Sequence, residues 1–152
     1  MRTISRKLLY VASVLVMAFP TIACAQSRQM QLVPAEQLKW VPCDPNAAEP
    51  DACQLAYFRG DPATEPNWKM LRAISGFVFP RHWHTSDEQI VMTQGTIAIA
   101  AEGQEKETLL RAGDYLYLPG RQVHWGSCPA ACVFYLFVDG PDSYIDVNTQ
   151  RP

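Results

Sequence analysis

Two histidines and a glutamate stand close together in the stretch from Gly76 to Gly95. His82 and His84 are two residues apart, so on a β-strand both side chains leave the same face. Glu88 follows after a polar trio that can turn the chain and return a carboxylate to the same point. Neutral imidazole and carboxylate together suit a divalent transition metal such as Mn, Fe, Co, Ni, Cu or Zn. The spacing therefore predicts a metal site.

The third histidine, His124, lies in a second stretch of similar character, Gly113 to His124. A single histidine is most often an ordinary hydrogen-bonded or surface residue, and most glutamates are solvated. The balance changes because the chain has only three histidines and each one falls at a ligand position. We therefore expect the metal ligands to be His82, His84, Glu88 and His124.

The segments that must position these side chains are short and rich in β-forming residues. From Trp68 onward, such runs are separated by Gly and Pro, and no stretch beyond residue 25 has a helical period of useful length. Short strands at this spacing predict an all-β sandwich or barrel. Its interior is expected to hold four large apolar side chains, Phe79, Met92, Phe134 and Phe137.

Residues 1–25 have the order of a secretory signal peptide, with a basic start, an apolar run from Leu8 to Phe19 and small residues at the end. The apolar run is short for a transmembrane helix. Ala-Cys-Ala at positions 23 to 25 fits signal cleavage and predicts export to the periplasm or out of the cell. The alternative is a lipoprotein anchored through Cys24, but Thr21 stands where a leucine is usual.

Cleavage would leave 127 of the 152 residues. We expect a strand and loop extension over residues 26–66, followed by a single barrel domain over residues 67–150. The three basic residues lost with the signal change the formal net charge from −2 to −5. A mildly acidic chain without a Lys or Arg cluster argues against nucleic acid as a partner. We expect a small-molecule ligand or substrate and no membrane span.

Four of the five cysteines lie beyond the expected signal peptide. An even number in an exported chain favours disulfides, and four cysteines allow three pairings. The local pairs, Cys43 with Cys53 and Cys128 with Cys132, each close a short loop that contains proline. A thiolate metal or redox site is the alternative.

The two histidine-containing stretches resemble the two motifs of the cupin superfamily. The first motif, G-x5-H-x-H-x3-E-x6-G, is matched in full by Gly76, His82, His84, Glu88 and Gly95. The second motif, G-x5-P-x-G-x2-H-x3-N, is matched by Gly113, Pro119 and His124. Arg121 occupies its second glycine position, with Gly120 one residue early, and Cys128 replaces the asparagine. The first departure is expected to shift a turn slightly, while the second leaves the ligand set intact.

The resemblance implies a small jelly-roll barrel with the metal inside, bound by the four residues predicted above. Cupin barrels often pair through edge strands, so it also implies a homodimer. It says little about the substrate, because cupins include dioxygenases, isomerases, lyases, sensors and storage proteins.

The first functional hypothesis is an exported metal-dependent oxidoreductase of the dioxygenase type, acting on a small oxygen-bearing substrate. The metal would leave open positions for substrate and O2, and Glu88 could also serve as a base. One alternative is a non-catalytic metal or small-ligand binding protein of the cell envelope. Another is a metal-dependent isomerase or lyase. No Lys or Arg is clearly placed for an acidic substrate, and Arg72 and Arg81 are the candidates.

Overall fold

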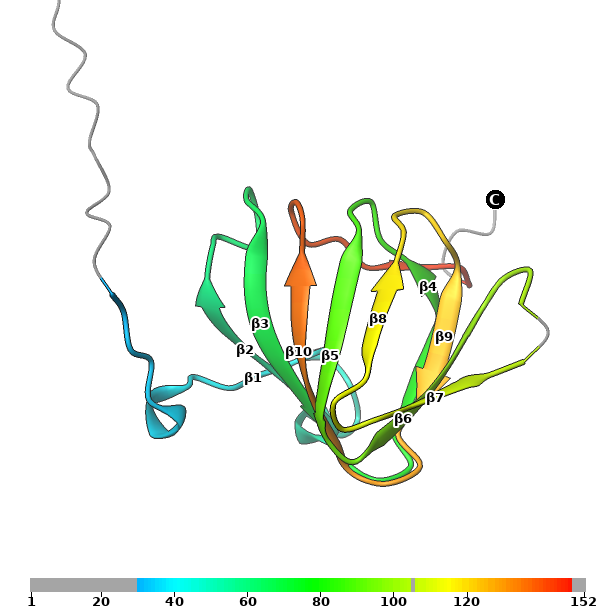
Figure 1. The fold of residues 1–152 in the computed structure, drawn as a ribbon, viewed down its shortest axis with the longest axis horizontal. Coiled ribbons are helices and arrows are strands. Elements are labelled where there is room, and N and C mark those ends of the chain that lie inside the picture. The colour runs from blue at the N-terminus through cyan, green and yellow to red at the C-terminus, as the bar shows by residue number, and fades with distance from the viewer. Residues whose placement is uncertain (1–29, 105, 149–152) are drawn as a thin grey trace, which may run out of the picture. The chain divides into compact units, whose positions relative to one another are not determined.

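The computed structural model describes residues 30–104 and 106–148 of the chain (Figure 1). The expected signal peptide, its cleavage site and Cys24 lie outside the described residues. The chain divides into the units Met1–Gln31 and Leu32–Pro152, and every described strand belongs to the second. Within the described part of the chain, no helix is long and apolar enough to cross a membrane.

The strands of the second unit form two antiparallel sheets. The six-stranded sheet runs in the order β1 (Val41–Pro42), β2 (Cys53–Arg59), β3 (Asn67–Ala73), β10 (Cys132–Val138), β5 (Glu88–Gln94) and β8 (Tyr115–Leu118). The five-stranded sheet runs in the order β11 (Ile145–Asp146), β4 (Val78–Trp83), β9 (His124–Ser127), β6 (Thr96–Ala101) and β7 (Thr108–Arg111). Two short 3-10 helices, η1 (Ala35–Gln37) and η2 (Pro50–Ala52), precede β2.

The two sheets face each other and enclose the apolar core, which confirms the predicted all-β jelly-roll barrel (Figure 1). Alternate residues of β3, β5 and β10 are buried, as expected for strands with one face toward the core. Strands β1 and β2 precede residue 67 but pair with each other and with β3. The segment before the predicted barrel therefore contributes two strands to the same sheet.

The chain passes from one sheet to the other at Gly95, between β5 and β6. Gly95 has a φ of +70°, and a Cβ at this position would lie 2.0 Å from the carbonyl oxygen of Ala131. Only glycine fits such a corner, because it tolerates positive φ and leaves room for the neighbouring backbone. This corner fixes the end of β5 opposite to Glu88.

Both local disulfides form, which confirms the pairing of Cys43 with Cys53 and of Cys128 with Cys132. The first bridge ties the loop before β2 to the start of that strand. The second closes the short connection between β9 and β10 and is fully buried. None of these four cysteines is left as a thiolate, so the alternative of a thiolate site is wrong in this structure.

Three of the four predicted interior side chains lie in the core region. Met92 and Phe134 are buried, and Phe79 packs against Phe134 with ring centroids 6.4 Å apart. The prediction for Phe137 is wrong. It alternates with the buried Leu136, so its ring lies on the outer face of β10, 4.5 Å from the ring of Trp68.

Candidate metal centre

The four predicted ligands come together at one end of the barrel. His82 lies near the end of β4 and pairs in register with His124, the first residue of β9. His84 follows β4 by one residue, and Glu88 opens β5 on the opposite sheet. The turn between His84 and Glu88 thus connects the two sheets and places the Glu88 carboxylate next to the histidines.

That turn, residues 85–87, is held on both sides. The backbone N–H of Asp87 donates to Asp139 Oδ1 at 2.9 Å, and Oδ1 of Asp87 accepts a hydrogen bond from the N–H of Gly120 at 2.7 Å. Tyr117 donates its hydroxyl proton to Oδ2 of the same carboxylate. The two hydrogen bonds to its carboxylate, from Tyr117 first and from Gly120 second, hold the pKa of Asp87 below its usual range. Asp87 therefore links the turn to two other loops at this end of the barrel.

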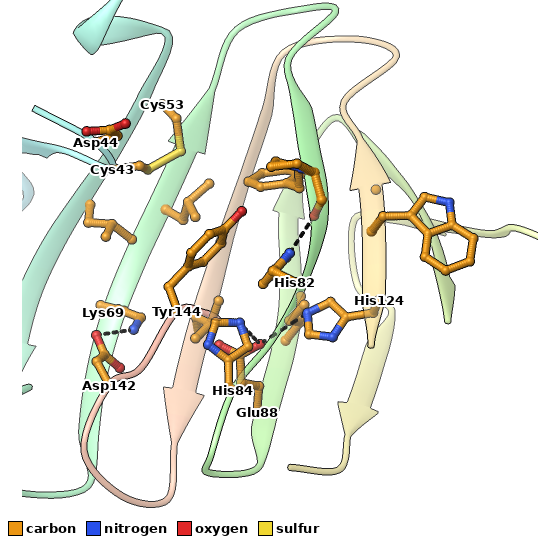
Figure 2. A pocket seen from close by; sticks show the side chains of 18 of the residues that line it. Cys43, Asp44, Cys53, Lys69, His82, His84, Glu88, His124, Asp142 and Tyr144 are labelled. Atoms are coloured by element: carbon orange, nitrogen blue, oxygen red, sulfur yellow. Dashed lines mark hydrogen bonds and ion pairs between the residues drawn. A yellow bond between two sulfur atoms is a disulfide. The ribbon is translucent and has the colours of Figure 1, made fainter. Parts of the chain in front are cut away.

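Figure 2 shows the side chains of His82, His84, Glu88 and His124 converging on one point. We refer to these four residues as the His-Glu cluster. One ring nitrogen from each histidine lies within 4.8 Å of those of the other two. Oε2 of Glu88 lies 3.3 Å from Nε2 of His84 and 3.8 Å from Nε2 of His124.

The outer nitrogen of each imidazole meets a backbone carbonyl. Nδ1 of His82 lies 2.6 Å from the oxygen of Pro80, and Nδ1 of His124 lies 2.9 Å from that of Gln122. Nδ1 of His84 is hydrogen-bonded to the oxygen of Ser143. A carbonyl accepts only, so the ring proton belongs on Nδ1 and the lone pair on Nε2. In all three histidines the lone pair of Nε2 is therefore available to bind a metal ion.

Burial keeps these imidazoles neutral. It lowers the pKa of His82 to about 3, helped by the nearby His124, and the pKa of His84 to about 4. The pKa of His124 is also lowered, again chiefly by burial. Burial raises the pKa of Glu88 to about 7, an effect that the electrostatic interactions with His124 and Lys69 oppose. Neutral imidazoles are the form that binds metal ions.

The donor set fits a divalent transition metal. Three nitrogen lone pairs and a carboxylate oxygen face one another, an arrangement that is repulsive unless a cation or proton lies among them. Each imidazole also has the backbone hydrogen bond that orients metal-binding histidines. Imidazole with carboxylate suits first-row ions such as Fe, Mn, Co, Ni, Cu or Zn, and the residues do not select among them.

The His-Glu cluster forms one wall of a cavity of about 620 Å³ between the two sheets. Its polar end also includes Lys69, Asp142 and Tyr144, as Figure 2 shows. The rest of the lining is largely aliphatic and aromatic, with contributions from Leu55, Leu71, Phe77, Phe79, Ile99 and Phe134. Such a lining suits a ligand with an oxygen-bearing head and an apolar body.

Tyr144 lies beside the cluster, in the segment between β10 and β11. Its ring stacks on that of His82, with centroids 4.3 Å apart and an interplanar angle of 18°. Partial burial raises the pKa of its hydroxyl to about 12. The sequence contains no signal for this contact, because Tyr144 belongs to neither motif and reaches the site only through the fold.

Neither arginine proposed for an acidic substrate lines the cavity. Arg72 donates to Gln54 and lies over the ring of Trp40, and Arg81 pairs with Glu102, with both partners exposed. Both arginines alternate along their strands with inward-facing residues, so their side chains point out of the barrel. The prediction that either binds an acidic substrate is therefore wrong.

The cation that does line the cavity is Lys69 on β3. Its residue type does not predict this position, because a lysine is usually exposed. The alternation of β3 places Lys69 on the same face as Leu71, and the fold turns this face inward rather than that of Trp68 and Met70.

Comparison with known proteins places these features in a family. Residues 28–142 match the family model described as the ChrR cupin-like domain. A sequence comparison with curated proteins finds no match.

Solved structures share the fold at low sequence identity. The polyketide cyclase RemF from Streptomyces resistomycificus is 16% identical, with a TM-score of 0.66 over 82% of this chain and 95% of its own. The DMSP lyase DddQ from Ruegeria pomeroyi is 14% identical, with a TM-score of 0.65 over 77% of this chain and 64% of its own. Salicylate 1,2-dioxygenase from Pseudoaminobacter salicylatoxidans is 15% identical, with a TM-score of 0.52 over 59% of this chain and 25% of its own.

These three enzymes catalyse different reactions, so at this identity the likeness carries the fold alone. The family match covers most of the chain, including all four residues of the His-Glu cluster. The chain belongs to the ChrR cupin-like family of the cupin superfamily.

Proposed function

We propose that this protein is an exported metal-dependent oxidoreductase of the dioxygenase type that acts on a small oxygen-bearing substrate. The observation that supports it best is the position of the His-Glu cluster, where four metal-compatible donors meet at the wall of a large, mainly apolar cavity. A purely structural ion would need no such cavity beside it.

In this proposal His82, His84, Glu88 and His124 are the ligands of one divalent metal ion. Three neutral imidazoles and one carboxylate would leave the centre with a net charge near +1, which favours an enolate or a carboxylate as the bound group. When bound, such a metal supplies Lewis acidity and, if it is redox-active, an electron path between substrate and O2.

The surrounding residues have separate roles. The carbonyls of Pro80, Gln122 and Ser143 hold the imidazoles with Nε2 toward the cavity, and Glu88 is the candidate base for a substrate proton. The apolar lining holds the body of the substrate and limits the access of water. In a dioxygenase reaction the substrate provides the electrons that reduce O2, and both oxygen atoms enter the product.

Two alternatives use the same residues. In an isomerase or lyase the centre would polarise the substrate while Glu88 moves a proton, and no O2 would be consumed. In a non-catalytic binding protein of the envelope, the metal and the two disulfides would mainly stabilise a small exported fold. The disulfides support an oxidising compartment, such as the periplasm or the cell exterior, in each of these cases.

The test begins with the protein secreted into an oxidising compartment and purified without chelators. We expect about one transition-metal ion per chain by elemental analysis, and O2 uptake with at least one member of a panel of enols, flavonoids and small carboxylates. The matched control is the metal-depleted protein restored with each candidate ion in turn. Protein without bound metal would contradict the ligand set. Bound iron or manganese with no O2 uptake across the panel would contradict the dioxygenase assignment and favour the alternatives.

A homodimer remains part of the proposal. Light scattering at several concentrations would test it, with a mass of one chain at all of them as the contradicting result.

A further inference from the structure

Lys69 is a buried cation in the wall of the cavity. It lies on the inward face of β3, its side chain is 7% exposed, and Nζ lies 2.5 Å from Oδ2 of Asp142. In the view of Figure 2, Tyr144 and His84 lie between this pair and His124. Burying an ammonium is costly, and an apolar residue would fill a purely structural position at lower cost.

Asp142 does not depend on Lys69 for its hydrogen bonds. Its Oδ2 also accepts from the hydroxyl of Tyr57 at 2.9 Å, and its Oδ1 accepts from Nδ2 of Asn67 at 3.2 Å. Its backbone N–H donates to Pro62. The segment that carries Asp142 is therefore tied to β2 and β3 without the ammonium.

The ammonium of Lys69, in contrast, has more N–H donors than hydrogen-bond acceptors around it among the described residues. A lysine carries three N–H groups. Among the described residues, Asp142 is the one hydrogen-bond acceptor of Nζ, with the ring of Tyr57 at 5.4 Å as a second, weaker contact. Two N–H groups remain for an acceptor inside the cavity.

We propose that Lys69 binds the carboxylate of an organic-acid substrate whose apolar body lies along the aliphatic and aromatic lining and whose other oxygen-bearing end reaches the His-Glu cluster. This assignment rests on the proposed function and gives its substrate class, an aryl or branched aliphatic carboxylate. The shared cavity carries the argument, because Lys69, the cluster and the apolar lining all face the same space.

A matched pair of probes tests the carboxylate preference. 3-Phenylpropionate and its neutral analogue 3-phenylpropionamide differ in charge but hardly in shape, and their binding is measured by calorimetry to the zinc-loaded and the metal-free protein at pH 7.5. Lys69→Met keeps the apolar stem and removes the charge. We expect it to weaken binding of the carboxylate at least about tenfold, the range for a hydrogen bond to a charged group, and to change binding of the amide less than about twofold.

Asp142→Asn is the control, because it breaks the ion pair but keeps the ammonium. It should tighten carboxylate binding, since the positive charge of Lys69 is no longer neutralised. If Lys69→Met does not fold, Lys69→Gln replaces it, with folding checked by circular dichroism. Two results would overturn the proposal: a carboxylate that binds the wild type no better than the amide does, or a preference for the carboxylate that survives the loss of the Lys69 charge.

These outcomes are separate from those of the proposed function. A Lys69-dependent preference in a protein that consumes no O2 would keep the anion site and reject the dioxygenase assignment. O2 uptake with a substrate whose affinity is independent of Lys69 would do the reverse.

Discussion

Oε2 of Glu88 lies 3.3 Å from Nε2 of His84, although neither atom carries a proton when the imidazole is neutral and the carboxylate is ionised. Two acceptors at this distance repel each other in a buried site, and a cation between them removes the repulsion. The stability of the metal-free barrel should therefore depend on the charge of Glu88.

Glu88→Gln tests this relationship through pH. Burial raises the pKa of Glu88 to about 7 from an ordinary value of 4.5. A carboxyl whose pKa is raised by folding contributes stability that is fully present below about 4.5 and is lost as pH rises through about 7. Without metal, the melting temperature of Glu88→Gln should therefore rise relative to wild type between pH 5 and pH 8. With zinc present, the order should reverse, because the variant lacks one ligand.

The control for this comparison is Glu102→Gln. Glu102 is an exposed partner of Arg81, with its side chain 65% accessible. Its removal should change the melting temperature little and without a trend over the same pH range. A constant difference between Glu88→Gln and wild type would show that the charge of Glu88 does not limit the metal-free fold.

His82→Ala and His124→Ala should each remove most of the bound metal and leave a folded barrel. Each change deletes one of the nitrogen donors that lie within 4.8 Å of one another. Both residues lie near strand ends, so the sheets should survive at a cost of about 1–2 kcal/mol in the free energy of unfolding. Elemental analysis measures the first effect and urea unfolding of the metal-free proteins the second. Metal retained at one ion per chain in both variants would rule out the four-ligand centre.

The two disulfides should differ in their contribution to stability. Cys43 and Cys53 are separated by 10 positions, and Cys128 and Cys132 by 4. In the chain-entropy description, removing the disulfide that closes the longer loop lowers the free energy of unfolding by about 3 kcal/mol, and removing the one that closes the shorter loop lowers it by about 2 kcal/mol. Urea unfolding of the two double-alanine variants measures both costs under identical conditions. A larger loss from the 128–132 pair would mean that packing of its buried sulfurs outweighs loop closure.

The sequence predicted the cluster better than its surroundings, and for a physical reason. The spacing of His82 and His84 places both on one face of a strand, and Glu88 follows after a single turn. Local structure is therefore enough to bring these three side chains together. Lys69 and Tyr144 reach the same cavity from strands and loops that are distant in the sequence. Their roles depend on which face of β3 is inside and on where the segment after β10 crosses the barrel end, and neither follows from local spacing.

Arg121 adopts the left-handed backbone that the second cupin motif assigns to glycine. Its φ is +66°, and its N–H donates to the carbonyl of His84 at 2.7 Å. The turn is therefore kept at this position, rather than shifted to Gly120, and the arginine backbone is strained. A left-handed conformation costs a non-glycine residue roughly 1–2 kcal/mol. A glycine avoids this cost, but it loses more conformational entropy on folding, which cancels part of the gain in stability.

Arg121→Gly should therefore raise the free energy of unfolding by about 0.5–1 kcal/mol and leave the metal content unchanged, as measured by urea unfolding and elemental analysis. Gly120→Ala is the matched control next to it. Its added Cβ would lie 2.7 Å from the carbonyl oxygen of Thr85, so this variant should lose stability. A loss of stability in Arg121→Gly would contradict this expectation. It would mean that the side chain of Arg121 stabilises the turn by more than its left-handed backbone conformation costs.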